Sequence, residues 1–279
     1  MLLAAPLLAL VICQIAMFAT TVYLHRYLAH GGIELRPEAR AVARVLIWMT
    51  TALKPRQWAR VHRYHHAVVD TPDDPHSPTN YGGSRRGAWY VFFRNGGLYT
   101  AATRDERLAA KYRDLAADQW DRWFFDRGEA GLVLGVGLIC AAMATVGHWL
   151  IGGWTGIAVG IGVALIASTL HAVMYILAGG TINGFGHSHT TRRNNGGHAT
   201  NMPIIAWLTV GEGWHRNHHA AENSPRLGHG HQVDLGWVAI RGLQILRLAR
   251  VTTRGAKGID RLQHLHATAT RTQPAHGAS

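Results

Sequence analysis

The stretch Arg60-Val61-His62-Arg63-Tyr64-His65-His66 places three histidines at positions i, i+3 and i+4 of a short polar segment. On an α-helix, residues three and four apart share one face and lie about 5–6 Å from each other. The adjacent rings of His65 and His66 point about 100° apart, so both can hardly serve one metal ion. The stretch therefore predicts a helix that presents imidazoles to two metal ions, one on each side.

Two related patterns occur elsewhere in the chain. The stretch 213–219 repeats the i, i+3, i+4 spacing, and HRYLAH at 25–30 spaces two histidines five apart. Positions i and i+5 lie about 140° apart on an α-helix, so an unbroken helix aims His25 and His30 poorly. Gly31 and Gly32 therefore predict that the helix ends there and lets His30 turn inward. A single histidine is more often an ordinary surface residue, but three such patterns together favour a metal site.

The basic residues fall in two blocks. All 28 Lys and Arg lie within residues 26–127 and 192–271. Three apolar stretches, each close to the ~20 residues that a spanning helix requires, lie outside these blocks: 4–24, 130–147 and 156–178. We therefore predict an all-α integral membrane protein with three transmembrane helices. Positive charge beside membrane spans explains the net charge of +12 without a nucleic-acid partner.

The order of the spans predicts on which side the histidines lie. Arginines follow the first span, so its end is expected on the cytoplasmic side. The apolar run 41–53 is too short to cross a bilayer and is expected to lie along its surface. The second and third spans form a hairpin through 149–154 and return the chain to the side it left. All three histidine patterns are then expected in one helical cap on the cytoplasmic face.

The segments around the patterns carry further expectations. The acidic turn 70–78 follows the first HxxHH stretch, and its carboxylates either orient ligand imidazoles or serve as ordinary turn residues. His76 is expected beside the ligands. His171, inside the third span, is either functional or a hydrogen-bonded core residue. Residues 1–251 are expected to form one membrane domain, and the polar residues 252–279 a disordered tail.

In order and spacing, four motifs resemble the histidine boxes of integral-membrane fatty acid desaturases, and the acyl-CoA (stearoyl-CoA type) branch is nearest: HRYLAH at 25–30, VHRYHH at 61–66 with DDPHSP at 73–78, NGFGH at 183–187, and GEGWHRNHH at 211–219. The likeness covers about 22–226. It implies that one iron is held by His25, His30, His62, His66 and His218. It implies that a second iron is held by His65, His187, His215 and His219, with Asn183 reaching it through a water. Relatives usually carry a full hairpin before the first box, so a fourth span missing from the N-terminal end stays open.

The resemblance also implies a reaction. A membrane-bound enzyme of this family uses O2 to introduce a cis double bond, delta-9 in the stearoyl-CoA branch, into a saturated fatty acyl chain carried by CoA or a lipid. The sequence contains no flavin or dinucleotide fingerprint, so electrons are expected from a separate ferredoxin, rubredoxin or cytochrome b5 with its reductase. Two alternatives stay open. One is a di-iron hydroxylase of acyl chains, alkanes or carotenoids in the same superfamily, and the other is a non-enzymatic metal transporter or sensor.

Overall fold

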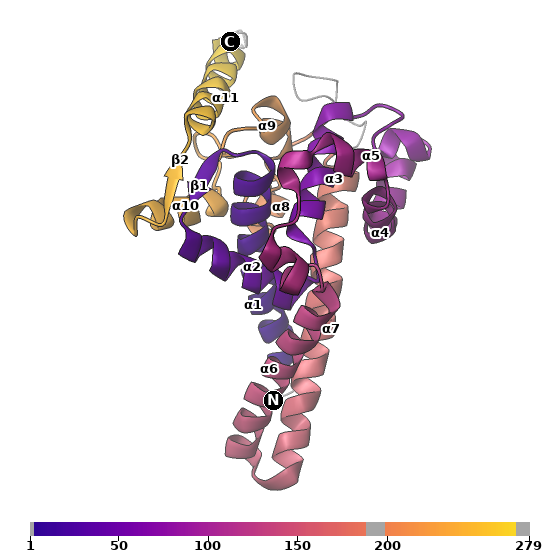
Figure 1. Ribbon diagram of the computed structural model, residues 1–279, viewed down its shortest axis with the longest axis vertical. Helices are drawn as coiled ribbons and strands as arrows, with labels where there is room; N and C mark the ends of the chain where they lie inside the picture. The colour runs from indigo at the N-terminus through magenta and orange to yellow at the C-terminus, as the bar shows by residue number, and fades with distance from the viewer. Residues whose placement is uncertain (1–2, 188–198, 272–279) are drawn as a thin grey trace, which may run out of the picture.

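Three long apolar helices form a shaft at one end of the molecule (Figure 1). The computed structural model describes residues 3–187 and 199–271. The first helix runs from Ala4 to Ala29 without a break, as α1 (Ala4–Ala19) and the π-helix η1 (Thr20–Ala29). The others are α6 (Gly128–Ile151) and α7 (Gly153–Phe185). The prediction of an all-α membrane protein with three apolar spans is thus confirmed within the described residues.

Small residues hold the shaft together. A Cβ atom on Gly160 of α7 would lie 2.0 Å from the carbonyl oxygen of Met143, and one on Gly147 of α6 would lie 2.0 Å from that of Gly156. Such contact between backbones is typical of helix pairs in membranes, where only small side chains permit it. α1 packs on α7 in the same manner, through a buried cluster of Ala5, Ala9, Val163 and Ala167.

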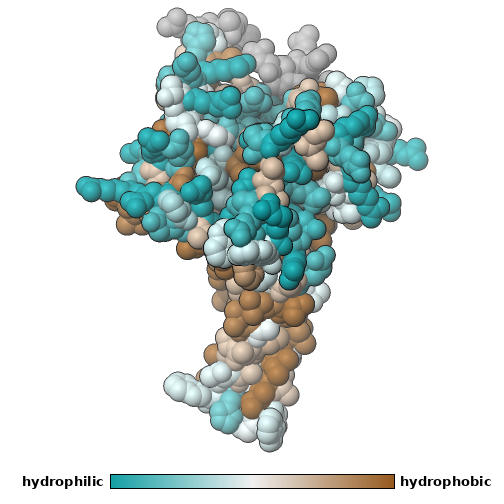
Figure 2. Space-filling model, in the orientation of Figure 1, coloured by the Kyte–Doolittle hydropathy of each residue, from teal (hydrophilic) through white to brown (hydrophobic). Residues whose placement is uncertain are grey.

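Residues 30–127 and 199–271 form a polar cap at one end of the shaft, and Figure 2 shows the change from the hydrophobic shaft to the hydrophilic cap. Its helices and strands are β1 (Ile33–Leu35), α2 (Pro37–Thr51), α3 (Pro55–Val68), η2 (Pro78–Tyr81), α4 (Ser84–Thr103), α5 (Glu106–Lys111), η3 (Arg113–Leu115), η4 (Asp121–Phe125), α8 (Pro203–Leu208), α9 (His215–Ala220), α10 (Leu235–Ile245), β2 (Ala249–Val251) and α11 (Thr253–Arg271). β1 and β2 pair antiparallel, with Ile33 opposite Val251. This short ribbon is the sheet that the all-α prediction did not anticipate.

The helix α2 contains most of the apolar run that was expected along the membrane surface. It contacts α6 where a Cβ on Gly135 would lie 2.2 Å from the carbonyl oxygen of Met49. Proline at the first position starts both α2 and α3, because its missing N–H costs nothing there and its φ is already helical. α2 ends at Ala52, whose φ of 57° is left-handed. The reversal brings α3, with its three histidines, over the end of the shaft.

The structure differs from the expectation of a disordered tail after residue 251. Thr253–Arg271 form the helix α11, while 272–279 lie outside the described residues. Gly255 and Gly258 allow the helix to lie directly on the backbone, since Cβ atoms there would lie 2.0 Å from the oxygen of Gly32 and 2.5 Å from the nitrogen of Ser224. Glycine lowers intrinsic helix propensity. Gly255 and Gly258 therefore allow the close packing of this helix, and they are also the reason that the sequence did not predict it.

Candidate metal centre

The first histidine pair lies on a π-helix. The backbone N–H of His30 donates to the carbonyl of His25 at 3.1 Å, and the two ring centroids are 4.9 Å apart. Because a π-helix joins residue i to residue i+5, its wider turn stacks residues that an α-helix would separate. The expectation that an unbroken helix aims these rings poorly is therefore wrong. The chain turns at Gly31, whose φ is 60°. This turn follows His30 in the sequence, so the alignment of the two rings does not depend on it.

The structure brings together the nine histidines that the family resemblance implied as metal ligands, here called the histidine cluster. His25, His30, His62 and His218 form one group, and His65, His187, His215 and His219 form another. Within each group the possible ligand atoms lie within 4.8 Å of one another. His66 joins the first group, because its Nε2 is 2.8 Å from Nε2 of His218. Thus α3 turns His62 and His66 to one side and His65 to the other.

The spacing of the ring nitrogens fits metal ligation. Two nitrogens bound to one metal about 2.1 Å away, at a right angle, lie about 3.0 Å apart. The Nε2–Nε2 distances are 2.8 Å for His30–His62, 3.0 Å for His25–His218, 2.8 Å for His187–His215 and 3.2 Å for His215–His219. A donor set made almost wholly of imidazole suits iron, zinc or copper. The cluster can therefore hold metal ions.

Carboxylates lie at the outer nitrogen of several of these rings. The Nδ1 atoms of four histidines lie near acids, at 2.7 Å for His25–Glu212, 3.0 Å for His65–Asp74, 3.3 Å for His66–Glu222 and 3.5 Å for His187–Asp70. A carboxylate that accepts the Nδ1 proton leaves Nε2 as the free lone pair and fixes the ring orientation. For His65 this contact is a hydrogen bond, to both oxygens of Asp74 at 3.0 Å, so the His65 ring is held with Nε2 free to bind a metal.

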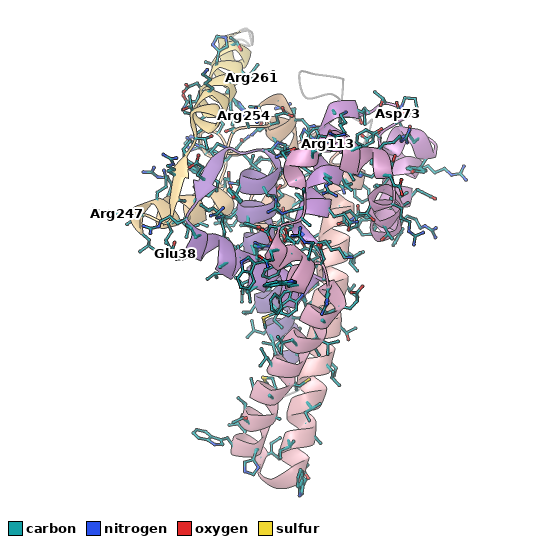
Figure 3. The ribbon with its side chains drawn as sticks, in the orientation of Figure 1. Glu38, Asp73, Arg113, Arg247, Arg254 and Arg261 are labelled. Carbon is teal, nitrogen blue, oxygen red and sulfur yellow. The ribbon has the colours of Figure 1, made fainter. Side chains whose placement is uncertain are left out.

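In the acidic turn after α3, Asp74 orients the His65 ring, and Asp70 lies beside the His187 ring. Asp74 and Asp70 contact ring nitrogens, whereas Asp73 lies at the outer edge of the cap (Figure 3). Sequence reasoning missed Glu212 and Glu222. Both lie three residues from a box histidine, Glu212 before His215 and Glu222 after His219. That spacing is the signal that could have found them.

Burial keeps six rings of the cluster uncharged near neutral pH. Loss of hydration, and then the neighbouring imidazoles, lower the pKa well below its usual value for six rings outside the spans: His30, His62, His65, His215, His218 and His219. Neutral imidazole is the form that binds metal. The fold therefore supplies these ligands without a competing proton near neutral pH.

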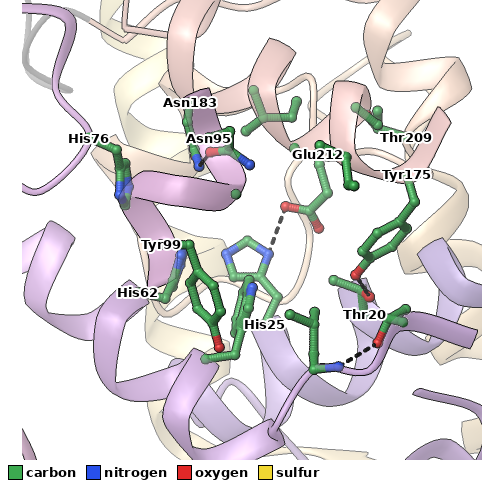
Figure 4. A pocket seen from close by; sticks show the side chains of 18 of the residues that line it. Thr20, His25, His62, His76, Asn95, Tyr99, Tyr175, Asn183, Thr209 and Glu212 are labelled. Atoms are coloured by element: carbon green, nitrogen blue, oxygen red, sulfur yellow. Dashed lines mark hydrogen bonds and ion pairs between the residues drawn. The ribbon is translucent and has the colours of Figure 1, made fainter. Parts of the chain in front are cut away.

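An apolar cavity of about 220 Å³ lies beside the cluster. His25, His62 and His65 line one part of it, and Met17 of α1 and Ile176 of α7 are among its apolar lining residues. Figure 4 shows His25, His62 and Tyr99 of α4 around this cavity. Such a pocket, mostly apolar with a few polar groups, is the usual form of a small-molecule site. An apolar ligand in this cavity would lie directly against the histidine rings.

Asn183, His76 and His171 have defined surroundings. Asn183 lines the cavity, and its amide donates to the side-chain oxygen of Asn95 at 2.8 Å. His76 stacks on His65 with centroids 4.5 Å apart, so it lies beside the cluster as expected. Nε2 of His171 lies 2.8 Å from the carbonyl oxygen of Thr50. His171 is therefore a hydrogen-bonded core residue that secures the end of α2.

A buried ion pair joins the first and last histidine boxes. Arg26 is 2% exposed, and its guanidinium donates to Asp234 at 2.8 Å and to the carbonyl oxygen of Pro225 at 2.7 Å. Asp234 also accepts the backbone N–H of Trp237 at 2.9 Å and so caps α10. In the sequence, Arg26 served only as a marker of membrane orientation. The structure shows that it fixes the loop after α9 against the helix that carries His25.

The fold and the cluster together define a class: helical membrane proteins whose cap gathers histidines into paired groups able to bind metal. The sequence profile described as fatty acid desaturase matches residues 2–227. The chain therefore belongs to the fatty acid desaturase family, which is a family of oxidoreductases, and the resemblance drawn from the boxes is confirmed.

Several characterised desaturases are similar to the chain. It is 30% identical over 241 residues to icosanoyl-CoA 5-desaturase of Limnanthes douglasii, covering 82% of this chain and 59% of that one. It is 32% identical over 236 residues to acyl-CoA C20 Delta5-desaturase of Anemone leveillei, covering 83% and 68%. It is 31% identical over 199 residues to sn-1 stearoyl-lipid 9-desaturase of Synechocystis sp., covering 70% and 54%. The chain thus spans between about half and two thirds of the length of these relatives.

Proposed function

We propose that this protein is a membrane-bound, O2-dependent fatty acyl desaturase that introduces a cis double bond, at the delta-9 position, into a saturated chain. The observation that carries the proposal is the pair of histidine groups, with ligand-like nitrogen spacings, at one end of an apolar cavity. The names of similar proteins include both delta-5 and delta-9 desaturases.

The proposed cofactor is a pair of iron ions, with O2 as co-substrate. One iron would be held by His25, His30, His62, His66 and His218, and the other by His65, His187, His215 and His219, with Asn183 acting through a water. Bound iron would supply the oxidising power that unactivated C–H bonds require, since side-chain acids and bases cannot remove hydrogen from such bonds. Asp70, Asp74, Glu212 and Glu222 would hold the ligand rings in orientation.

The task of the cavity is positioning. Its apolar walls would bury the acyl chain, exclude water and fix two neighbouring methylenes beside His25, His62 and His65. Held in this way, one carbon pair reacts and the rest of the chain is protected. The hydroxyl groups of Thr20 and Tyr175 lie 2.6 Å apart at the wall and satisfy each other, so they impose no polar demand on an alkyl chain.

The proposed partners follow from the membrane setting. The substrate would be an acyl-CoA or an acyl-lipid, and electrons would come from a separate ferredoxin, rubredoxin or cytochrome b5 with its reductase. The active site would face the cytoplasm. The confinement of Lys and Arg to residues 26–127 and 192–271 supports this orientation, because basic residues gather on the cytoplasmic side of membrane proteins.

Fatty acid profiling tests the proposal. The chain is expressed in a host that lacks delta-9 desaturation, together with a working electron donor, beside His65→Ala and the control His148→Ala at the far end of the shaft. We expect a new delta-9 monounsaturated acid in the wild type and in the control, and none with His65→Ala. A product that gains oxygen would instead indicate a hydroxylase. Metal analysis that finds no iron in the purified wild type would contradict the proposed cofactor.

A further inference from the structure

A second recess lies on the cap, between α11 and the loop that follows α9. This recess, here called the α11 groove, has a volume of about 350 Å³ and is lined by Ala221, Glu222, Asn223, Thr253, Arg254, Lys257, Gly258 and Arg261. Among the described residues it shares no lining residue with the apolar cavity. Its α11 wall lies beyond residues 2–227, which the family profile matches. The groove is thus a feature separate from the substrate site.

The groove carries an ordered row of positive charge. Arg254, Lys257 and Arg261 are exposed and occupy positions i, i+3 and i+7 of α11, so they share one face and extend over roughly 10 Å of the helix. Figure 3 shows Arg254 and Arg261 on the same helix at the outer end of the cap. Because Gly255 and Gly258 seat α11 tightly on the neighbouring backbone, the row is held in a fixed position.

The opposite wall of the groove leads to the histidine cluster. The side chain of Glu222 is 48% exposed, yet one of its oxygens lies 3.3 Å from Nδ1 of His66. Nε2 of His66 in turn lies 2.8 Å from Nε2 of His218. A single surface residue therefore connects the groove to a ring of the first histidine group, on a route that does not pass through the apolar cavity.

We propose that the α11 groove is the docking site of an acidic one-electron carrier protein, which delivers electrons to the metal centre through Glu222 and His66. This inference rests on the proposed function. For each double bond, two reduced carriers would each lose one electron. These electrons, two protons from solvent and the two hydrogens taken from the acyl chain reduce one O2 to two waters. The substrate occupies the cavity, so electrons need a separate entry.

The charges of the groove favour an acidic protein over a small anion. Arg254, Lys257 and Arg261 form an exposed row that extends over roughly 10 Å, so it can face several carboxylates of a protein at once, whereas a single small anion cannot engage the whole row. Opposed charge patterns of this kind steer two proteins together and set their orientation. The resulting complex would weaken as salt is raised.

The test measures binding of two probes, the soluble domain of cytochrome b5 and a [2Fe–2S] ferredoxin, to the purified full chain at low ionic strength. One variant carries Arg254→Glu, Lys257→Glu and Arg261→Glu, and a milder one carries Gln at the same positions. The matched control carries Arg85→Glu, Arg86→Glu and Arg94→Glu on α4, which lies on the other side of the cap (Figure 1). We expect at least one probe to bind the wild type and the control, and to bind the reversed variant roughly tenfold or more weakly. The Gln variant should be intermediate.

Two further measurements separate this proposal from the proposed function. A chemical reductant with a small mediator should support the same desaturation in the wild type and in the Gln variant, because it bypasses docking. If it yields no product in the wild type, the desaturase proposal fails while the binding data still judge the groove. The second measurement is the affinity of coenzyme A for the same proteins. The docking proposal is overturned if neither carrier binds the wild type, or if the reversed variant binds the carriers as well as the control does. It is also overturned if the reversed variant binds coenzyme A more weakly but binds both carriers unchanged.

Discussion

Single carboxylates decide how the histidine rings are held. His65 is 1% exposed, and its Nδ1 lies 3.0 Å from both oxygens of Asp74. Asp74 also accepts the backbone N–H of Asp70 at 3.0 Å and of His76 at 3.2 Å. The carboxylate is therefore fixed before any metal arrives, and it fixes the ring in turn.

Asp74→Asn should weaken metal binding without removing a ligand. The amide keeps the shape of the side chain but can no longer act as an anionic acceptor for both the ring and the backbone donors, and loss of such a partner typically costs about 10–100-fold in metal affinity or activity. The measurement is the iron content of purified protein after dialysis against graded chelator.

Asp73→Asn serves as the control for this prediction, since Asp73 lies at the outer edge of the cap (Figure 3). Equal iron retention by Asp74→Asn and the wild type would show that the carboxylate does not support the ligand.

Among the helices, two departures from ordinary α-helical packing build the site. The π-helix η1 aligns His25 with His30, and π-helical turns are often found at functional sites. The glycines of α6 and α7 let the two backbones touch. The π-helix thus sets the first histidine box, while the glycine contacts set the hairpin whose α7 ends beside the cluster.

Gly160→Leu should disrupt the shaft, whereas Gly162→Leu should be tolerated. A Cβ at position 160 would lie 2.0 Å from the carbonyl oxygen of Met143, while one at 162 has no atom within 4 Å. A large side chain at the closely packed position forces the helices apart. We expect a lower melting temperature in detergent and a lower yield of monodisperse protein for Gly160→Leu alone. Similar melting temperatures for both variants would contradict this account of the packing.

Across the whole molecule, exposed apolar side chains lie at two levels. At the far end of the shaft, Trp149 and Trp154 are 87% and 84% exposed. On the cap, α8 and α10 expose Ile204 and Ile245, at 77% and 80%. Aromatic residues favour the boundary between lipid and water, and amphipathic helices can lie within it. We infer that the bilayer surrounds the shaft and that α8 and α10 rest on its surface at the side of the cap.

Labelling of single cysteines should show that the hairpin and the cap lie on opposite sides of the membrane. Cys13 and Cys140 are replaced by alanine, and a cysteine is introduced at Trp154 or at Arg113. In intact cells, a membrane-impermeant maleimide should label Trp154→Cys alone, because α6 and α7 return the chain to the side that it left. After lysis, both should react. Labelling of Arg113→Cys in intact cells would place the metal centre outside.

Much of the site could be predicted from the sequence because the determining patterns are local. Apolar stretches of about twenty residues predict spans wherever they occur. The angular difference between His65 and His66 likewise depends only on helix geometry. For these reasons the three spans and the facing of the α3 histidines agree with the structure, and the same motifs pointed to the family.

The tertiary structure decided what depends on residues distant in sequence. Arg26 meets Asp234, His25 meets Glu212, and α11 lies on Gly32 and Ser224; none of these pairs follows a helical period. The π-helix was hidden for a related reason, since hydrogen bonds between residues five apart leave no distinct mark in a pattern of hydrophobic residues. Local periodicity thus determined the helices and their histidines, and only long-range contacts determined how those histidines are oriented and reached.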